Sequence, residues 1–258
     1  MKEIGIEEVH DILYDIMVDV DEFCRREGIR YSLGYGTLLG AVRSGDFIPW
    51  DDDADIIMPR ADFDRFTATY KGKYSCIMDV RTPDVFYVSG HAKVHDPSTN
   101  KYIGSKKFRL SYGVSLDIFP LDPVPDDGEE CRALMKKAIH THRRLLYRSR
   151  LFPHGSLLML MEAYMHSYDW WLRRCNAIAR SCDGKDCSRI GVLMGARSMK
   201  NIHPKNFFEH LGEIRLREHS FPCPEDPAAY LSQIYGPDYM TPPPESERTG
   251  HGGSVWKL

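Results

Sequence analysis

The sequence lacks the features that mark membrane-spanning, secreted and nucleic-acid-binding proteins. Its most apolar window, residues 156–165 (SLLMLMEAYM), has about half the length of a membrane-spanning helix and contains Glu162. We therefore interpret this window as one face of a core helix. No apolar signal core follows the N-terminus, and the seven cysteines form no paired framework, so we expect a cytoplasmic protein in a reducing compartment.

An excess of positive charge is also missing. The formal net charge is −3, and the charged residues, 28% of the chain, are mixed in sign along it. Backbone binding to nucleic acid requires a basic face, so nucleic acid is excluded as a main partner. With 258 residues and 42% hydrophobic content, the chain is long enough to form a packed globular core.

The hydrophobic pattern changes along the chain. Three- and four-residue spacings predict a helix over 6–27, ended by Gly28, and the pattern predicts further helices over TLLGAVR, ADFDRFTATY, 129–150 and 156–181. Short strands are predicted at IRYSLGYG, DADIIM, 74–80, 88–96, 100–105 and 113–121, with extended pieces near 189–194 and 213–217. We expect an α+β fold, as one compact unit or two lobes in contact, with a strand-rich core over 1–125 and a helical region with an irregular C-terminal tail over 126–258, packed on that core.

Four aspartates gather in FIPWDDDADIIMPR, residues 47–60. In a strand, residues two apart face the same side, so Asp53 and Asp55 present their carboxylates together while the residues between them face the core. Paired carboxylates suit a hard divalent cation, which takes oxygen ligands. We expect Asp52 to be solvent-exposed, and the pattern leaves the role of Asp51 open.

A further aspartate, Asp117, lies in the apolar stretch VSLDIFPLD. An unpaired carboxylate is costly there, and a role as third metal ligand or as general base beside the metal explains its presence. A simpler interpretation is an ion pair with a nearby arginine or lysine. Similarly, the simpler interpretation of DDDAD taken alone is a solvated loop.

The stretch GYGTLLGAVR places glycines before a helix start. Thr37 is positioned to cap this helix, and free N–H groups at a helix N-terminus attract anions, with Arg43 farther along. An anion cradle, paired aspartates and a remote aspartate are the pattern of metal-assisted phosphoryl transfer. The simpler interpretation of the glycines and Thr37 is a turn and a cap.

Four stretches together resemble the LicD family of phosphorylcholine transferases, which is related to fukutin and fukutin-related protein. They are GTLLGAVRSGDFIPWDDDADIIMPRADFDRF, AKVHD, SLDIFPLD and YLSQIYGPDYMTPPPESER. The resemblance covers residues 20–125 and 218–250, and it is specific because GTLLGAVR and IPWDDDAD occur at a fixed separation.

The resemblance implies a nucleotidyltransferase-like mixed sheet and transfer of a phospho-alcohol from a CDP-linked donor, with release of CMP. The donor is CDP-choline for LicD and CDP-ribitol for the fukutin group. The implied cofactor is magnesium, with manganese as a substitute. The implied acceptor is a sugar or polyol hydroxyl of a cell-envelope glycan or its precursor, such as lipopolysaccharide, teichoic acid or capsule, reached from the inner face of the membrane with at most peripheral contact.

When the family's site residues are matched to this sequence, the resemblance implies that Asp53 and Asp55 are metal ligands. Asp117 matches the third carboxylate of the site, which ligates the metal or accepts the proton of the acceptor hydroxyl. Gly36–Thr37 matches the donor-phosphate turn, and Arg43 extends this phosphate site. Lys93 matches a basic position and balances phosphate charge, although a strand lysine on the surface is an equal interpretation.

A choline donor requires recognition of a trimethylammonium group by aromatic faces. The candidates are Trp50, beside the aspartates, and Tyr35 and Tyr239, with Tyr112 and Tyr235 also available. Each of them alone is also compatible with a packing role.

Two alternative functions remain from the sequence: a nucleotidyltransferase that uses a nucleoside triphosphate, and a non-catalytic module that binds choline or glycan. Two further features are ambiguous. Cys175, Cys182 and Cys187 suggest zinc but lack the tight spacing of a zinc knuckle. The basic segment 140–150 is expected to be a solvated helix face, with anionic lipid or an anionic glycan as the alternative contact.

Overall fold

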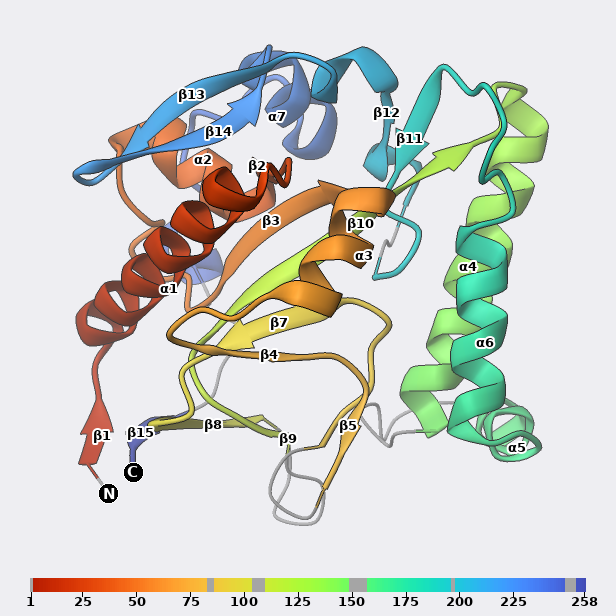
Figure 1. Cartoon of the computed structure of the whole chain (residues 1–258), viewed down its shortest axis with the longest axis horizontal. Coiled ribbons are helices and arrows are strands. Elements are labelled where there is room, and N and C mark those ends of the chain that lie inside the picture. The colour runs from red at the N-terminus through yellow and green to blue at the C-terminus, as the bar shows by residue number, and fades with distance from the viewer. Residues whose placement is uncertain (1, 83–85, 104–109, 149–156, 196–197, 249–253) are drawn as a thin grey trace.

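A long strand, β10, organises the central sheet of the computed structural model (Figure 1), which describes residues 2–82, 86–103, 110–148, 157–195, 198–248 and 254–258. The sheet contains β2 (Ser32–Leu33), β3 (Ala54–Pro59), β4 (Ser75–Ile77), β7 (Ala92–His95), β10 (Ser115–Val124), β11 (Arg189–Gly191) and β12 (Ile202–Pro204). β3 runs parallel to β10 along one edge, and β2 pairs with β3. Along the other edge, β7 pairs with the first half of β10 and β11 with the second half.

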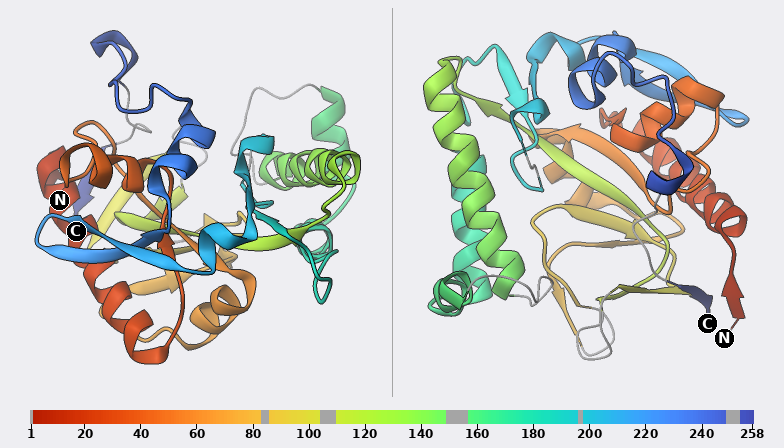
Figure 2. Two further views of the ribbon diagram at one scale, coloured as in Figure 1. Left: turned by 90° about the horizontal axis from the view of Figure 1, so that it is seen from above. Right: turned by 180° about the vertical axis from the view of Figure 1, so that it is seen from behind.

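Helices cover this sheet and extend it sideways (Figure 1). They are α1 (Ile6–Glu27), α2 (Tyr35–Ser44), α3 (Arg60–Thr69), α4 (Gly128–Arg148), α5 (Leu157–Tyr164), α6 (Tyr168–Ala179) and α7 (Pro227–Tyr235), with short 3-10 turns at Met199–Asn201, Lys205–Phe208 and Glu245–Glu247. α1 and α3 lie over the sheet, whereas α4 and α6 stand side by side as a separate layer with α5 at one end (Figure 2).

The two ends of the chain meet in a small second sheet. Its order is β1 (Lys2–Ile4), β15 (Val255–Lys257), β8 (Thr99–Ile103) and β9 (Leu110–Tyr112). Two hairpins complete the described strands: β5 (Val80–Arg81) with β6 (Phe86–Tyr87), and β13 (Leu211–Leu216) with β14 (His219–Pro224). The chain ends are therefore tied to the strand that follows the central β7.

The expected mixed α+β class is confirmed, and the best-predicted element is α1. Its bounds are those that the apolar spacing predicts, and Gly28 ends it with φ 61°, a left-handed conformation that glycine adopts at little cost. The strand at DADIIM is confirmed as β3. By contrast, the single helix predicted over 156–181 is two helices, because Ser167 caps a new start by accepting a hydrogen bond from Trp170 N–H.

The interpretation of residues 156–165 as a core helix face is wrong. Leu157 is 75% exposed and Leu158 66% exposed, while Ala163 is the buried residue of α5. The helix lies on the end of the α4–α6 pair, where it has little sheet or helix surface to cover. The C-terminal tail is also more regular than expected, since it contains α7 and β15.

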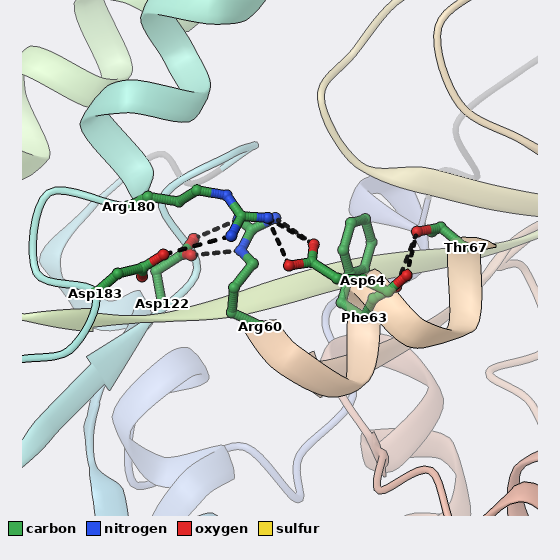
Figure 3. A network of polar contacts seen from close by, with 7 residues as sticks. All are labelled: Arg60, Phe63, Asp64, Thr67, Asp122, Arg180 and Asp183. Carbon is green, nitrogen blue, oxygen red and sulfur yellow. Dashed lines mark hydrogen bonds and ion pairs between the residues drawn. The ribbon is translucent and has the colours of Figure 1, made fainter. Parts of the chain in front are cut away.

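Two ion pairs, one buried and one partly exposed, connect the layers (Figure 3). Arg60 of α3 makes a bidentate contact with Asp122 of β10, with Nε–Oδ1 at 2.6 Å and Nη2–Oδ2 at 2.8 Å. Arg180, just after α6, reaches Asp64 of α3 at 2.6 Å. The same α3 helix therefore fixes β10 from one side and the α4–α6 layer from the other, which holds the site-bearing strand in place.

Candidate active site

Three charged residues lie in one row across the central sheet. In the strand register, Asp117 of β10 stands opposite Asp55 of the parallel strand β3 and opposite Lys93 of the antiparallel strand β7. Register partners on adjacent strands share a face of the sheet. The fold thus brings together two of the predicted carboxylates and the predicted basic residue, which are far apart in the sequence.

Lys93 is buried, so the surface interpretation of this lysine does not hold. Its ammonium pairs with the Asp117 carboxylate and lies 4.9 Å from the ring centroid of Tyr112 and 5.5 Å from that of Tyr87. Burial lowers the pKa of Lys93, but Asp117 and then the two tyrosines outweigh it and hold this pKa well above its ordinary value. The lysine is therefore a fixed positive charge in an aromatic enclosure.

Asp117 is correspondingly held as an anion. Burial raises its pKa, but the Lys93 ammonium and, after it, His91 hold the pKa below its ordinary value. The His91 Nε2 atom lies 3.5 Å from Asp117 Oδ2, is buried and makes no hydrogen bond within the described residues, while Nδ1 contacts Ser89 Oγ at 2.9 Å. Burial lowers the pKa of His91, which favours its neutral form.

Burial alternates along the aspartate cluster, residues 51–55. Asp51, Asp53 and Asp55 are partly accessible, whereas Asp52 and Ala54 between them are buried. The expectation that Asp52 is solvent-exposed is wrong: its carboxylate pairs with Lys101 of β8 at 3.0 Å. Asp51, whose role the sequence left open, lies on the Asp53–Asp55 face, because the strand-like alternation begins before β3 does.

The charges of these aspartates act on one another. Burial raises the pKa of Asp55 well above its ordinary value, and the charges of Asp53, Asp117 and Asp51, in that order, raise it further. A β-carbon added at Gly36 would lie 2.6 Å from Asp51 Oδ2, so the start of α2 approaches this carboxylate closely. Gathered carboxylates of this kind are stabilised by a cation.

The start of α2 differs from the expected cap. Gly34 is the N-cap, and Thr37 is three residues inside the helix, where its hydroxyl accepts a hydrogen bond from Asp55 N–H at 2.8 Å. Gly34 N–H in turn donates to the Asp55 carbonyl at 3.1 Å. The helix start therefore clamps the backbone of Asp55 from both directions, and Thr37 positions the strand instead of closing the helix.

Arg43 lies in the last turn of α2 and binds the C-terminal tail. Its guanidinium donates to the carbonyl of Tyr239 and to that of Thr241 at 3.2 Å, and its Nε is buried without a hydrogen bond among the described residues. Tyr239 is partly buried against the main core. Arg43 and Tyr239 are thus joined to each other, and their shared contact places the tail beside α2.

The aromatic candidates occupy different environments. The Tyr35 hydroxyl is buried and donates to Asn201 Oδ1 at 2.8 Å, and the residue has φ 45°, which is strained for a side chain of this size. Trp50 is partly exposed, and the Arg248 guanidinium lies 4.9 Å from its ring centroid. A positive group therefore already stacks on Trp50. Burial and then the charges of Asp55, Asp51 and Asp53 raise the pKa of Tyr235, which places this residue near the cluster.

The family model described as LicD/FKTN/FKRP, nucleotidyltransferase domain, matches residues 28–159, half of the chain and the whole row of charged residues. The chain belongs to the LicD family. It is 29% identical to the lipopolysaccharide cholinephosphotransferase LicD of Haemophilus influenzae over 97% of both chains. A Rickettsia prowazekii protein, RP689, is 35% identical over 88 residues, 30% of this chain.

The match of this LicD-family protein to the family model extends beyond the segment that the sequence motifs suggested, through α4 and into α5. The fold expected from the resemblance, a mixed sheet with flanking helices, is confirmed. Within the described residues, no three His, Cys, Asp or Glu side chains form a ready-made metal site. This includes Cys175, Cys182 and Cys187, which are buried free thiols.

Sequence reasoning missed the enclosure of Lys93 by Tyr87 and Tyr112. The available signal was the alternation of His91, Lys93 and His95 in HAKVHD, which places polar side chains on one side of a strand. No local signal in the sequence indicated that two tyrosines from other strands enclose the lysine, because that contact depends on strand order. No helix in the described ranges combines the length and apolar character that crossing a bilayer requires.

Proposed function

We propose that this protein transfers phosphocholine from CDP-choline to a hydroxyl of a lipopolysaccharide-type glycan or its precursor and releases CMP. The observation that carries the proposal is the row formed by Asp55, Asp117 and Lys93, with Asp51 and Asp53 beside it. It joins carboxylates that can hold a cation to a fixed positive charge that can face phosphate. The cholinephosphotransferase name of the similar Haemophilus protein supports the choice of choline.

The carboxylates fit a divalent cation chemically. Burial and three neighbouring aspartates raise the pKa of Asp55 and so disfavour its ionised form. Mg²⁺, or Mn²⁺ in its place, takes oxygen ligands, and we assign Asp53 and Asp55 as its ligands, with Asp117 as the third. When bound, the cation neutralises charge on the donor diphosphate.

Asp117 fits a ligand role better than a general-base role. A carboxylate whose pKa is lowered by Lys93 is a weak proton acceptor, but it remains an anion at any working pH. We therefore propose that Asp117 contributes charge and orientation and that Lys93 holds its position. The same ammonium balances the donor phosphates at the Asp117 side of the site.

In the proposed reaction, the oxygen of an acceptor hydroxyl forms a bond to the phosphorus that carries choline. The bond from that phosphorus to the bridging oxygen of CMP breaks, and CMP leaves with its electron pair. The hydroxyl proton passes to solvent or to a neighbouring acceptor. Gly36 and Thr37 at the start of α2, with Arg43 farther along it, are proposed to face the donor phosphates, and Trp50, Tyr35 and Tyr239 remain the candidates for choline contact.

The experiment is a panel of CDP-choline, CDP-ribitol, CDP-glycerol and CTP with Mg²⁺, read by release of CMP or pyrophosphate. We expect CMP from CDP-choline, increased by a lipopolysaccharide-type acceptor, and loss of at least about 100-fold in the Asp55→Asn variant. The matched control is Asp15→Asn, which removes an exposed carboxylate of α1 outside the site. Pyrophosphate from CTP with no CMP from any CDP-alcohol would show instead a nucleotidyltransferase, and ligand binding without turnover would show a binding module.

The proposed acceptor also suggests where the protein works. We propose a lipid-linked or nucleotide-linked glycan precursor as the acceptor, and a lipid-linked one would lie at the membrane surface. We propose a location on the cytoplasmic side, at the inner face of the membrane, with peripheral contact. Fractionation of cells into soluble and membrane parts tests this location, and release of the bound protein by high salt distinguishes peripheral contact from insertion.

A further inference from the structure

Six exposed large apolar side chains lie close together on α5 and at the start of α6. They are Leu157, Leu158, Met161, Tyr164, Met165 and Trp170. The first five fall at helical spacings on one face of α5 and its final turn, and Met165 is 73% exposed. Figure 2 shows α5 at the far end of the α4–α6 pair, away from the central sheet. We call these six residues the α5 patch.

The outward direction of the α5 patch is fixed by contacts on the opposite face of the helix. Glu162, the acidic residue of α5, accepts a hydrogen bond from the buried Arg144 of α4 at 2.8 Å. Trp171 Nε1–H donates to the Ala163 carbonyl at 2.9 Å. Because Glu162 and Ala163 face inward, Leu157, Leu158 and Met161 lie on the outer face, so their exposure follows from the packing of the helix.

The surroundings of the patch carry positive charge. Residues 136–174 contain eight Lys or Arg and two Asp or Glu, a net charge of +6, whereas the remainder of the chain carries −9. Arg143, Arg173 and Arg174 are exposed. Arg148 lies 4.4 Å from the ring centroid of Tyr164, at the margin of the patch. An apolar helix face with a basic surround is the arrangement of interfacial helices that bind anionic lipid.

We propose that the α5 patch docks onto an anionic lipid bilayer and holds the protein at the membrane surface. The eight-residue α5 is too short to span a bilayer, so its outer face enters only the headgroup region. A second copy of the chain is a poorer partner, because a two-fold interface would bring the exposed Arg143, Arg173 and Arg174 close to the same arginines of the other copy. Anionic lipid matches both the apolar face and the charge.

This inference concerns attachment and does not depend on the proposed chemistry, because lipid binding is measured without turnover. The test is co-sedimentation of the full chain with vesicles of phosphatidylcholine alone and of phosphatidylcholine with about one third phosphatidylglycerol. We expect binding to the anionic vesicles, at least about tenfold weaker binding to the neutral ones, and loss of the difference at high salt.

The deciding variant is Leu158→Glu, which places a charge on the outer face of α5. The matched control is Leu258→Glu, since Leu258 is 69% exposed and Leu158 66% exposed. We expect L158E to reduce vesicle binding at least about tenfold and L258E to leave it within about twofold. If L158E fails to fold, as judged by circular dichroism, the pair Leu158→Ser and Met165→Ser replaces it.

Three results would overturn the proposal. They are absence of wild-type binding to anionic vesicles, equal loss of binding in L158E and L258E, and a wild-type dimer in solution that L158E converts to a monomer. The last result would assign the patch to a second copy of the chain. Reduced vesicle binding in the variant Arg173→Gln with Arg174→Gln would add support, because it isolates the charge contribution from the apolar one.

Discussion

The hydroxyl oxygen of Thr37 accepts a hydrogen bond from the backbone N–H of Asp55 at 2.8 Å. This contact ties the first turn of α2 to the start of β3, and it is reinforced by Gly34 N–H donating to the Asp55 carbonyl. The position of the central carboxylate therefore depends on a helix that comes before it in the sequence. Gly36, which lies between Gly34 and Thr37, leaves room for the Asp51 carboxylate.

Replacing Thr37 with valine is expected to reduce activity more than stability. Valine has the shape of threonine but accepts no hydrogen bond, so Asp55 N–H is left unpaired, at a cost of about 1–3 kcal/mol in the free energy of unfolding. A shift of Asp55 lowers kcat about 10- to 100-fold. Thr37→Ser keeps the hydroxyl and should retain most activity; equal activity in T37V and wild type would show that the contact has no positioning role.

Lys93→Met should destabilise the fold and also abolish turnover of the remaining folded protein. It leaves Asp117 buried without its cation, which costs about 3–5 kcal/mol. The matched control is Lys101→Met, which breaks the similarly buried pair with Asp52. Urea unfolding measures both losses, and activity per folded molecule separates them: K101M should keep most of it and K93M should not. If K93M kept its activity per folded molecule and K101M lost it, Lys93 would have no role in the proposed mechanism.

The contact between Trp50 and Arg248 leads to a prediction about the binding of the donor. Arg248 occupies the Trp50 ring at 4.9 Å, so a quaternary ammonium that uses the same ring must replace it. We expect Arg248→Ala to lower KM for CDP-choline and Trp50→Leu to raise it by about 3- to 10-fold. CDP-glycerol, which carries no cation, is the control and should respond little to either change. Identical effects on both donors would exclude Trp50 as a choline contact.

Stability should fall in mild acid because buried histidines resist protonation. Burial lowers the pKa of His142 to about 4, whereas in the unfolded chain it titrates near 6.5. As the pH falls below about 6.5, the unfolded chain binds a proton at His142 before the folded protein does. The free energy of unfolding therefore decreases between about pH 6.5 and 4, by on the order of 3 kcal/mol. His142→Gln keeps an N–H for the Ser89 carbonyl and should flatten urea-unfolding stability between pH 7.5 and 4.5. An unchanged slope would contradict this assignment.

Local patterns in the sequence predicted the parts of the fold that depend on nearby residues. The apolar spacing of α1 and the alternation around Asp53 and Asp55 are of this kind, since neighbours in sequence determine which side chains share a face. The same alternation, extended by two residues, also places Asp51 on that face and Asp52 on the buried one. The sequence contained this information, but the strand-like pattern continues into a segment that looked like a turn.

Local sequence patterns do not predict contacts between elements that are distant in the sequence. The pair of Asp52 with Lys101 joins a residue just before β3 to one on β8, and Lys93 lies opposite Asp117 only because β7 and β10 are adjacent. Leu158 is a case in which the local pattern predicted burial and the structure shows exposure. Its apolar window predicted a core position, but whether a helix face is covered depends on what packs against it, and here α5 has an uncovered face.

Phosphocholine transfer can be read by mass spectrometry of an isolated lipopolysaccharide glycan after incubation with Mg²⁺ and CDP-choline deuterated in its methyl groups. We expect a mass gain equal to one labelled phosphocholine per modified site, release of an equal amount of CMP, and neither product with Asp55→Asn. A glycan that gains no labelled phosphocholine, under conditions where wild-type protein binds CDP-choline, would contradict the assignment as a phosphocholine transferase.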